Sequence, residues 1–366
     1  MALPQPRPGV LSIPLYEAGK AQIKGMSRVI KLSSNEAALG PSPAAVAAYA
    51  PLASSLQLYP AGDSADLRSA IAEVHGLEAS RIICGAGSDE MFALLCRAYA
   101  GPGDEAIHTV HAFAIFGIYT KSVGATPVVV PETDLTASVD AMLAAVTPAT
   151  RIVFLANPNN PTGTCISKSE VARLRDGLRE DIILVLDGAY AEFVDAPDYD
   201  GGFDLARTTS NTIVTRTFSK IYGLAALRLG WAYGPKAIID CMERLRAPFN
   251  VTKAAQVAGI AAVRDQAHVA KARAHNNKWK GVALQRLRGA GLKVRETWGN
   301  FLLPEFPAIP GRTAAEADAF LQSQGIIVRR VDAYGLPNHL RMSIGNDEEM
   351  TALLDAITRF MEGRHG

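Results

Sequence analysis

The sequence predicts an α/β protein in which a larger domain, built on a mostly parallel sheet flanked by helices, is followed by a smaller α+β domain. The first observation is the length, because 366 residues are too many for one ordinary core and suggest about two domains. The second is the alternation of short β-rich runs with helical stretches in the middle of the chain. The third is a change of texture after about Pro248, where Ala, Lys and Arg become frequent.

Short apolar runs mark the strands of the first domain. The candidates are residues 81–84, 105–109, 126–130, 151–155, 182–186 and 211–215, with 228–233 as a further one. Helical patterns lie between them, for example at 89–99 and 169–179. The first of these helices has Asp89 and Glu90 in its opening turn and Gly101-Pro102-Gly103 as its stop.

The part of the chain after Pro248 predicts the second domain. A long helical region is expected over about 253–290, followed by short strands near 292–296, 301–303, 326–329 and 339–344 and a helix at 314–324. Residues 1–32 are expected to form an extended arm that packs on the second domain or on a partner subunit. We therefore expect an arm at 1–32, a large domain at 33–248 and a small domain at 249–366.

The composition excludes several classes of protein. The net charge of +1, with 48% hydrophobic and 20% charged residues, describes a soluble globular protein without the basic stripe of a nucleic-acid binder. The longest apolar runs, such as 182–186, are far too short to span a bilayer, and the proline-broken N-terminus lacks the apolar segment of a signal peptide. The four cysteines form no CxxC pair, and nothing in the sequence completes a metal site around His108 and His111. We expect a cytoplasmic protein without a metal.

Lys220 is the most informative candidate for chemistry. It follows the run 211–215 and the residues Thr217, Phe218 and Ser219, and Arg228 comes eight residues later. A lysine that leaves a buried strand beside hydroxyl groups and an arginine can form an imine with an aldehyde cofactor that also carries a phosphate. Pyridoxal 5′-phosphate has both groups. A lysine after a strand is also commonly a solvated loop residue. The residues at the other strand ends therefore decide whether Lys220 belongs to a cofactor site.

The turn after 81–84 has the composition of a phosphate site. It contains Gly85-Ala86-Gly87-Ser88-Asp89-Glu90 and leads into a helix. Glycines allow close backbone approach, and the free N–H groups at a helix start attract phosphate. Glu90 stands where the dinucleotide-binding fingerprint has its third glycine, so that motif is excluded. The alternative is an ordinary strand-to-helix turn.

Polar residues also follow two further strands, at the edge where ligands collect in parallel sheets. The run 151–155 is followed by Asn157-Pro158-Asn159-Asn160-Pro161-Thr162-Gly163, whose amides can donate to a phenolate oxygen or can simply make turns. Asp187 ends the run 182–186 and either caps the next segment or keeps a pyridine nitrogen protonated. Tyr190 could reach the oxygen on the ring of the cofactor. Phe113 could stack on that ring or belong to the core.

Together these motifs resemble the fold-type I pyridoxal-phosphate-dependent aminotransferases. The chain is similar in particular to the histidinol-phosphate aminotransferase family. That similarity rests on Lys31-Leu32-Ser33-Ser34-Asn35-Glu36, Leu39-Gly40-Pro41-Ser42-Pro43, Tyr59-Pro60, Gly87-Ser88-Asp89-Glu90 and Leu340-Arg341-Met342-Ser343-Ile344-Gly345. The resemblance covers nearly the whole chain, with the motifs in family order.

The resemblance implies a role for each candidate residue. Lys220 is the Schiff-base lysine, Asp187 pairs with the pyridine nitrogen, and Asn160 and Tyr190 touch the ring oxygen, while Phe113 stacks on the ring. The cofactor phosphate is held by Ser88, Asp89, Thr217, Ser219 and Arg228, with Tyr59 reaching it from the other subunit of a homodimer. The substrate contacts are Tyr16, Asn35, Arg329 and Arg341. The implied reaction is a ping-pong transamination from a small amino donor to 2-oxoglutarate.

Two departures from the family pattern leave alternatives open. Gly188 follows Asp187 where the family usually has glutamate, and His111-Ala112-Phe113 replaces a stretch in which a proline and a small hydroxyl residue are common. The nearest alternative is an aromatic amino acid aminotransferase, which the same residues would serve. A phosphothreonine decarboxylase and a non-catalytic effector-binding module are the further alternatives.

Overall fold

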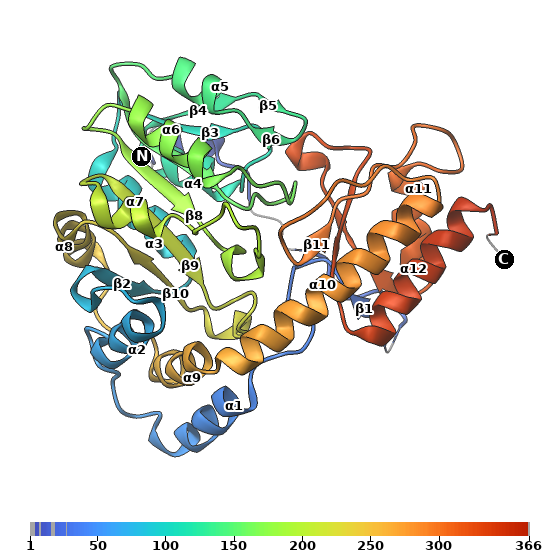
Figure 1. Cartoon of the computed structure of the whole chain (residues 1–366), viewed down its shortest axis with the longest axis horizontal. Coiled ribbons are helices and arrows are strands. Elements are labelled where there is room, and N and C mark those ends of the chain that lie inside the picture. Colours follow the sequence, from blue (N-terminus) through green and yellow to red (C-terminus); the bar gives the residue numbers. More distant parts are fainter. Residues whose placement is uncertain (1–3, 7–8, 16–18, 27, 365–366) are drawn as a thin grey trace.

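The computed structural model describes residues 4–6, 9–15, 19–26 and 28–364. A large body that contains the main sheet and a smaller body that contains the C-terminus lie side by side, and helix α10 (Gln266–Gly289) runs along both (Figure 1). Within these residues, no helix combines the length and the apolar character that crossing a membrane requires.

A seven-stranded sheet with the order β2-β10-β9-β8-β7-β3-β4 forms the centre of the large body. Strand β10 runs antiparallel to both of its neighbours, and the other neighbours pair in parallel. The bounds of the seven strands are β2 (Ile82–Gly85), β3 (Glu105–Thr109), β4 (Thr126–Val130), β7 (Thr150–Ala156), β8 (Ile183–Asp187), β9 (Thr212–Thr217) and β10 (Gly230–Tyr233). Each of the seven predicted strands is confirmed, with ends that shift by at most two residues.

Alternate residues of the strands build separate cores on the two faces of the sheet, because successive side chains of a strand point to opposite sides. In β7, Val153 and Leu155 belong to one hydrophobic cluster, and Ile152 and Phe154 belong to the other. Six helices cover the first face, namely α1 (Pro43–Tyr49), α2 (Ala65–His75), α5 (Val139–Ala144), α6 (Lys168–Gly177), α7 (Phe203–Thr208) and α9 (Lys253–Arg264). Helices α3 (Ser88–Tyr99), α4 (Ile115–Ser122) and α8 (Lys236–Leu245) cover the second. The continuous apolar character of the strands follows from this burial on both faces.

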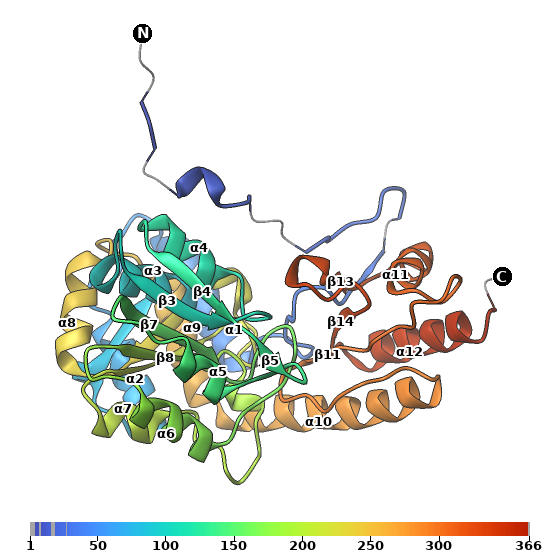
Figure 2. The same cartoon turned by 90° about the horizontal axis from the view of Figure 1, so that it is seen from above.

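The small body is built from short strands and two helices packed on α10. A three-stranded antiparallel sheet has the order β11-β14-β13, with bounds β11 (Phe301–Leu302), β13 (Arg329–Arg330) and β14 (Leu340–Ser343). Helices α11 (Ala314–Ser323) and α12 (Asp347–Met361) each begin with a capping box. Strand β1 (Ile30–Lys31) pairs in parallel with β12 (Ile326–Ile327), so the end of the arm packs on the small body as expected (Figure 2).

Two sequence predictions for the second half need correction. The strand predicted at 292–296 is not formed, and only an isolated bridge joins Lys293 to Glu305. The alternating apolar pattern at Leu292 and Val294 arises because both side chains are buried in the core of the small body. Such burial does not require hydrogen bonds to a neighbouring strand. The helical region expected at 253–290 is two helices, because Asp265 ends α9 and caps α10 by accepting a hydrogen bond from the His268 N–H.

We propose to keep the division into an arm, a large domain and a small domain, with the second boundary inside α10 rather than at residue 248. Helix α9 buries Ala255 and Ala262 in the core of the large sheet. Along α10, Val269 still belongs to that core, whereas Trp279 and Leu284 belong to the core of the small body. A short hairpin, β5 (Glu132–Thr133) with β6 (Thr136–Ala137), extends from the large body toward the small one.

Candidate active site

One pocket at the carboxyl edge of the central sheet gathers most of the residues that the sequence singles out. Its lining includes Asn35, Ser88, Asp89, Phe113, Asn160, Asp187, Tyr190, Thr217, Ser219, Lys220, Arg228, Arg329 and Arg341. These side chains come from the ends of β7, β8 and β9, from the start of α3, and from β13 and β14 of the small body. The pocket therefore lies between the two bodies, where ligands collect in open parallel sheets.

Lys220 follows β9 and is buried within the pocket. Its Nζ donates a hydrogen bond to the Ser34 carbonyl oxygen at 3.3 Å. Burial, together with the positive charge of Arg341, lowers the pKa of Lys220 to about 8. A buried amine with such a pKa is partly uncharged near neutral pH, as a nucleophile or a base must be.

Asp187 is the last residue of β8 and carries its carboxylate into the pocket. Its Oδ1 accepts hydrogen bonds from Thr215 Oγ1 at 3.0 Å and from the Ala189 N–H at 3.2 Å. Burial nevertheless raises the pKa of Asp187 to about 6, more than these two bonds lower it. A positive charge placed against this carboxylate would relieve the cost of its burial.

The turn between β2 and α3 meets an arginine at one end of the pocket. The Nη1 of Arg228 donates to Ser219 Oγ at 3.1 Å, and its Nη2 lies 3.4 Å from Asp89 Oδ2. A Cβ atom at Gly87, where φ is +87°, would lie 2.7 Å from Arg228 Nη2. The glycine thus permits the close approach of the guanidinium to the start of α3, whose first N–H groups have no partner within the helix.

Hydroxyl groups complete this end of the pocket. Thr217 Oγ1 accepts a hydrogen bond from the Ser219 N–H at 3.0 Å, which fixes the chain as it leaves β9 toward the lysine. Arg228 itself has a φ of +47°, a left-handed conformation that a non-glycine residue rarely adopts. Such strain at a ligand site is typical of a residue that its surroundings hold in place for function.

Two chains of hydrogen bonds define the middle of the pocket. Tyr190 accepts a bond from Asn35 Nδ2 at 2.9 Å, and Asn35 Oδ1 accepts one from Ser343 Oγ at 3.0 Å. Burial raises the pKa of Tyr190 to about 12, so its hydroxyl keeps a proton to donate. Asn160 Oδ1 accepts from Arg341 Nη1 at 2.5 Å. Since its oxygen is engaged, the amide of Asn160 has its NH₂ group left as a donor.

Arg329 and Arg341 stand opposite each other in the antiparallel pair β13–β14, and both line the pocket. The Nη2 of Arg341 also donates to the Ser33 carbonyl oxygen at 2.8 Å, which ties the guanidinium to the segment that follows β1. Two guanidinium groups from neighbouring strands form a site for anionic groups on a substrate, because each fork can bind a carboxylate or phosphate.

These residues fit pyridoxal 5′-phosphate. The arginine, hydroxyl and helix-start groups at one end suit its phosphate, and the buried Asp187 suits its pyridine nitrogen. Tyr190 and Asn160 present donors for its ring oxygen, and Phe113 and Ala189 line the same pocket as apolar contacts for its ring. At the phosphate end, a Cβ at Gly87 would fill space beside Arg228, so the glycine keeps this end of the pocket open.

The two departures from the family pattern have structural explanations. A Cβ at Gly188 would lie 1.9 Å from Nη1 of Arg216, a fully buried arginine on β9, so the glycine makes room for this guanidinium. His111 Nδ1 lies 2.8 Å from Glu132 Oε2 of β5, a carboxylate partner that sequence spacing did not suggest. Across the described residues, no three His, Cys, Asp or Glu side chains gather as metal ligands would.

Two predicted residues do not join the pocket. Tyr59 is 80% exposed and stacks on Phe249, with 4.6 Å between the ring centroids, away from the lining. Its contribution to a partner subunit stays a prediction. Tyr16 lies outside the residues that the structure describes.

Sequence reasoning also missed some residues of the site. Ser34, Ala189 and Tyr334 line the pocket, and Thr215 supports Asp187. Thr215 and Ala189 lie at predicted strand ends and could have been found from that position. Tyr334 follows the short strand β13 in the small body, and no signal in the sequence marks it.

Comparison with known proteins agrees with this geometry. Residues 27–357 match the family described as aminotransferase class I and II. A histidinol-phosphate aminotransferase of Rhodospirillum rubrum is 54% identical over 361 residues, covering 99% of this chain and 98% of the relative, and one of Dinoroseobacter shibae is 54% identical over 97% of each chain. The solved structure of a histidinol-phosphate aminotransferase from Sinorhizobium meliloti in complex with pyridoxal-5′-phosphate superposes with a TM-score of 0.90 at 26% identity, covering 99% of this chain and 98% of its own. The chain belongs to the class I and II aminotransferase family, the fold-type I enzymes that depend on pyridoxal phosphate.

Proposed function

We propose that this protein is a histidinol-phosphate aminotransferase that uses 2-oxoglutarate as the amino acceptor. The structural observation that carries the proposal is the pair Arg329 and Arg341, which face the same pocket as Lys220 from adjacent strands. The relatives that match over nearly the whole chain at 51–54% identity are named histidinol-phosphate aminotransferases. A phosphorylated amine and a dicarboxylate each carry an anionic group away from the reacting atoms. An arginine can bind either group, because its guanidinium matches both phosphate and carboxylate.

Lys220 supplies the amine that this chemistry needs. When bound, pyridoxal phosphate supplies a carbonyl carbon that amines attack and a ring that accepts an electron pair. The Nζ of Lys220 would hold the cofactor, and the same amine would take the proton from the carbon next to the nitrogen of the amino donor. Its pKa of about 8 lets the amine lose and regain a proton near neutral pH.

Asp187, Tyr190 and Asn160 tune and orient the ring. The Asp187 carboxylate, held by Thr215 and the Ala189 N–H, places a negative charge where the ring nitrogen is protonated. Tyr190 and Asn160 donate hydrogen bonds to the ring oxygen. Arg341 is bonded to Asn160, so the group that binds substrate touches the group that orients the ring.

The proposal includes a cytoplasmic homodimer. Four free cysteines, of which Cys84 and Cys96 are buried, are in keeping with a reducing compartment. Tyr59 and Phe249 are large exposed apolar residues that line one surface groove with Leu56 and Leu58. We propose that this surface meets a second copy of the chain and delivers Tyr59 to the phosphate end of its pocket.

The experiment compares two donors in matched variants. The ratio of kcat/KM for histidinol phosphate to that for phenylalanine is measured in the parent, in Arg329→Ala and in Arg330→Ala. Arg330 is the control, because it belongs to the same strand but pairs with Asp332 and does not line the pocket. A charge-assisted bond is worth about 1.5–3 kcal/mol, so Arg329→Ala should lower the ratio by about one to two powers of ten.

The other outcomes identify the alternatives. A parent that prefers phenylalanine, or a ratio that Arg329→Ala leaves unchanged, would favour an aromatic aminotransferase. Carbon dioxide released from phosphothreonine would indicate a decarboxylase. Binding without amino transfer to 2-oxoglutarate would indicate an effector-binding module.

A further inference from the structure

We propose that Glu90 is the positioning residue that shapes the phosphate-binding turn between β2 and α3. This inference rests on the proposed cofactor site, and it assigns a role to an acid that no step of the reaction uses. Glu90 lies in the first turn of α3, next to Ser88 and Asp89, whose N–H groups face the phosphate in that proposal.

The carboxylate of Glu90 folds back over the turn. Its Oε2 accepts a hydrogen bond from the Ala86 N–H at 2.6 Å and a second from Asn250 Nδ2 at 2.9 Å. Asn250 Nδ2 also lies 3.3 Å from the Cys84 carbonyl oxygen. The Glu90 oxygen therefore joins the turn to the segment before α9, and the Asn250 amide joins that segment to the end of β2.

These bonds select which N–H groups of the turn are left for an anion. The Ala86 N–H is taken by Glu90, and the Gly87 N–H is taken by the Gly85 carbonyl oxygen at 2.8 Å. The next two N–H groups, of Ser88 and Asp89, open α3 and have no acceptor within the helix. The bonds to Glu90 and Gly85 thus leave the N–H groups of Ser88 and Asp89 as the donors of the turn that an anion can use, beside Arg228.

Both sides of the turn are closely packed. A Cβ at Gly85 would lie 2.6 Å from Glu90 Oε2 and 2.3 Å from the Met91 methyl group, so the carboxylate occupies the space that a side chain there would need. At the opposite side, a Cβ at Gly230 would lie 2.3 Å from the Ser88 nitrogen. The turn therefore lies between β10 on one side and the Glu90 carboxylate on the other.

Electrostatics argues that the role is geometric. A carboxylate near a phosphate site repels the anion, so the charge of Glu90 by itself weakens phosphate binding. A hydrogen-bond acceptor at the same position without the charge should then serve as well or better. This reasoning predicts opposite effects for two substitutions, since Glu90→Gln keeps an acceptor and Glu90→Ala removes it.

The same bond connects the turn to the proposed dimer surface. Asn250 follows Phe249, which has a φ of +55° and stacks on Tyr59. Asn250, the partner of Glu90, is thereby the immediate sequence neighbour of the ring that supports Tyr59, which is proposed to serve the other subunit.

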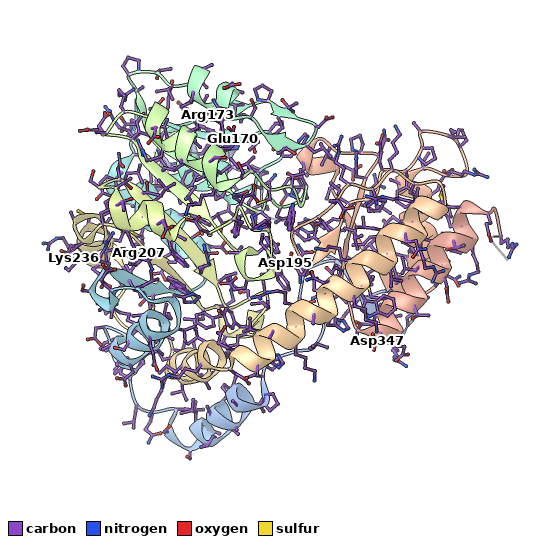
Figure 3. The ribbon with its side chains drawn as sticks, viewed as in Figure 1. Glu170, Arg173, Asp195, Arg207, Lys236 and Asp347 are labelled. Atoms are coloured by element: carbon purple, nitrogen blue, oxygen red, sulfur yellow. The ribbon has the colours of Figure 1, made fainter. Side chains whose placement is uncertain are left out.

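The test measures phosphate recognition rather than turnover. The full chain is stripped of cofactor, and the dissociation constants of pyridoxal 5′-phosphate and of pyridoxal are measured by fluorescence quenching. The ratio of the dissociation constant of pyridoxal to that of pyridoxal 5′-phosphate reports how strongly the protein recognises the phosphate. The control is Glu170→Ala, because Glu170 also lies in the first turn of a helix, α6, on the outer face of the molecule (Figure 3).

Glu90→Ala should lower the ratio by about tenfold, because the released turn no longer presents its two N–H groups. Glu90→Gln should keep the parent's ratio or raise it, and Glu170→Ala should leave the ratio unchanged. A ratio unchanged in Glu90→Ala, or lowered equally in Glu90→Gln, would overturn the positioning role. Melting curves show whether each variant is folded, and Glu90→Gln keeps the test decisive if Glu90→Ala is not.

The design separates this inference from the function on which it rests. If the parent binds pyridoxal as tightly as pyridoxal 5′-phosphate, the phosphate site itself is wrong and the inference falls with it. If the parent discriminates and Glu90→Ala discriminates equally well, only the inference about Glu90 is wrong.

Discussion

The burial of Asp187 predicts that the cofactor-free protein becomes more stable when this residue is replaced by asparagine. Burial raises the pKa of the carboxyl from 3.8 to about 6. At neutral pH the folded chain therefore holds an ionised carboxylate whose burial costs free energy. One pKa unit corresponds to about 1.36 kcal/mol, which gives a cost of about 3 kcal/mol above pH 6. Asparagine has no charge and can still accept from Thr215 and the Ala189 N–H.

The sign of the pH dependence follows from the direction of the shift. A carboxyl whose folded pKa is raised favours folding fully below its unfolded value, near pH 4, and loses that contribution as the pH rises to about 6. The advantage of Asp187→Asn over the parent should therefore be near zero at pH 4, grow between pH 4 and 6, and stay level above. At about 2.1 cal/mol/K per residue, an unfolding entropy for 366 residues converts about 3 kcal/mol into a rise in Tm of about 4 °C.

The assay is thermal unfolding of the cofactor-free parent and variant from pH 4 to 8.5. Asp195→Asn serves as the control, because Asp195 is exposed in a loop beside α10 and accepts a hydrogen bond from Asn277 (Figure 3). It should change Tm by no more than about 1 °C, as surface substitutions usually do. Added pyridoxal phosphate should stabilise the parent more than Asp187→Asn, because only the parent offers a negative charge to the ring. A variant less stable than the parent at pH 8, or an advantage independent of pH, would refute the reasoning.

Three further predictions concern the lysine, the glycine beside the buried arginine and the exposed tyrosine. Because burial lowers the pKa of Lys220 to about 8, covalent uptake of pyridoxal phosphate by the cofactor-free protein should speed up through about pH 8. Borohydride trapping and peptide mapping should place the cofactor on Lys220, and a label on another lysine would sink the assignment. Gly188→Ala should lower the free energy of unfolding in urea by about 1–3 kcal/mol, because its Cβ would lie 1.9 Å from Arg216 Nη1. The control Gly281→Ala, which has open space around it on α10, should raise the free energy of unfolding by about 0.5–1 kcal/mol. Mixing Tyr59→Phe with Lys220→Ala subunits should give mixed dimers that contain one intact site, and a fully active monomer in sedimentation would exclude the shared site.

The strands and the carboxyl-edge residues could be predicted because both leave local signals. Residues 105–109 and 126–130 form strands with the predicted bounds, and the second of them is a β-branched run between turns, a pattern typical of strands. Asp187 and Lys220 could be predicted because a charged side chain at or just beyond the end of a buried strand lies at the edge of the sheet. What decided these predictions was the position of a residue relative to the end of a strand.

The remaining features depend on contacts between distant parts of the chain. Arg216 lies between Thr215 and Thr217 in β9, and only the fold shows that it is buried, stacked on Phe203 and bonded to the Gly201 carbonyl oxygen. The pairing of His111 with Glu132 joins the turn after β3 to the short strand β5. Neither feature has a periodic pattern, so the sequence carries no local signal for them.

The pKa values of Lys220 and Asp187, the two central titratable groups of the pocket, are shifted by burial in directions that the binding of one ligand would reverse. Burial makes Lys220 easier to deprotonate and Asp187 easier to protonate, so each loses part of its charge in the cofactor-free protein. The amine of Lys220 would hold bound pyridoxal phosphate and the Asp187 carboxylate would face its protonated ring nitrogen, so binding would relieve both costs. The same burial that destabilises the empty pocket therefore favours binding of the cofactor. A protein selected for stability alone would replace both residues with apolar ones, and their presence together at neighbouring strand ends is best explained by the ligand.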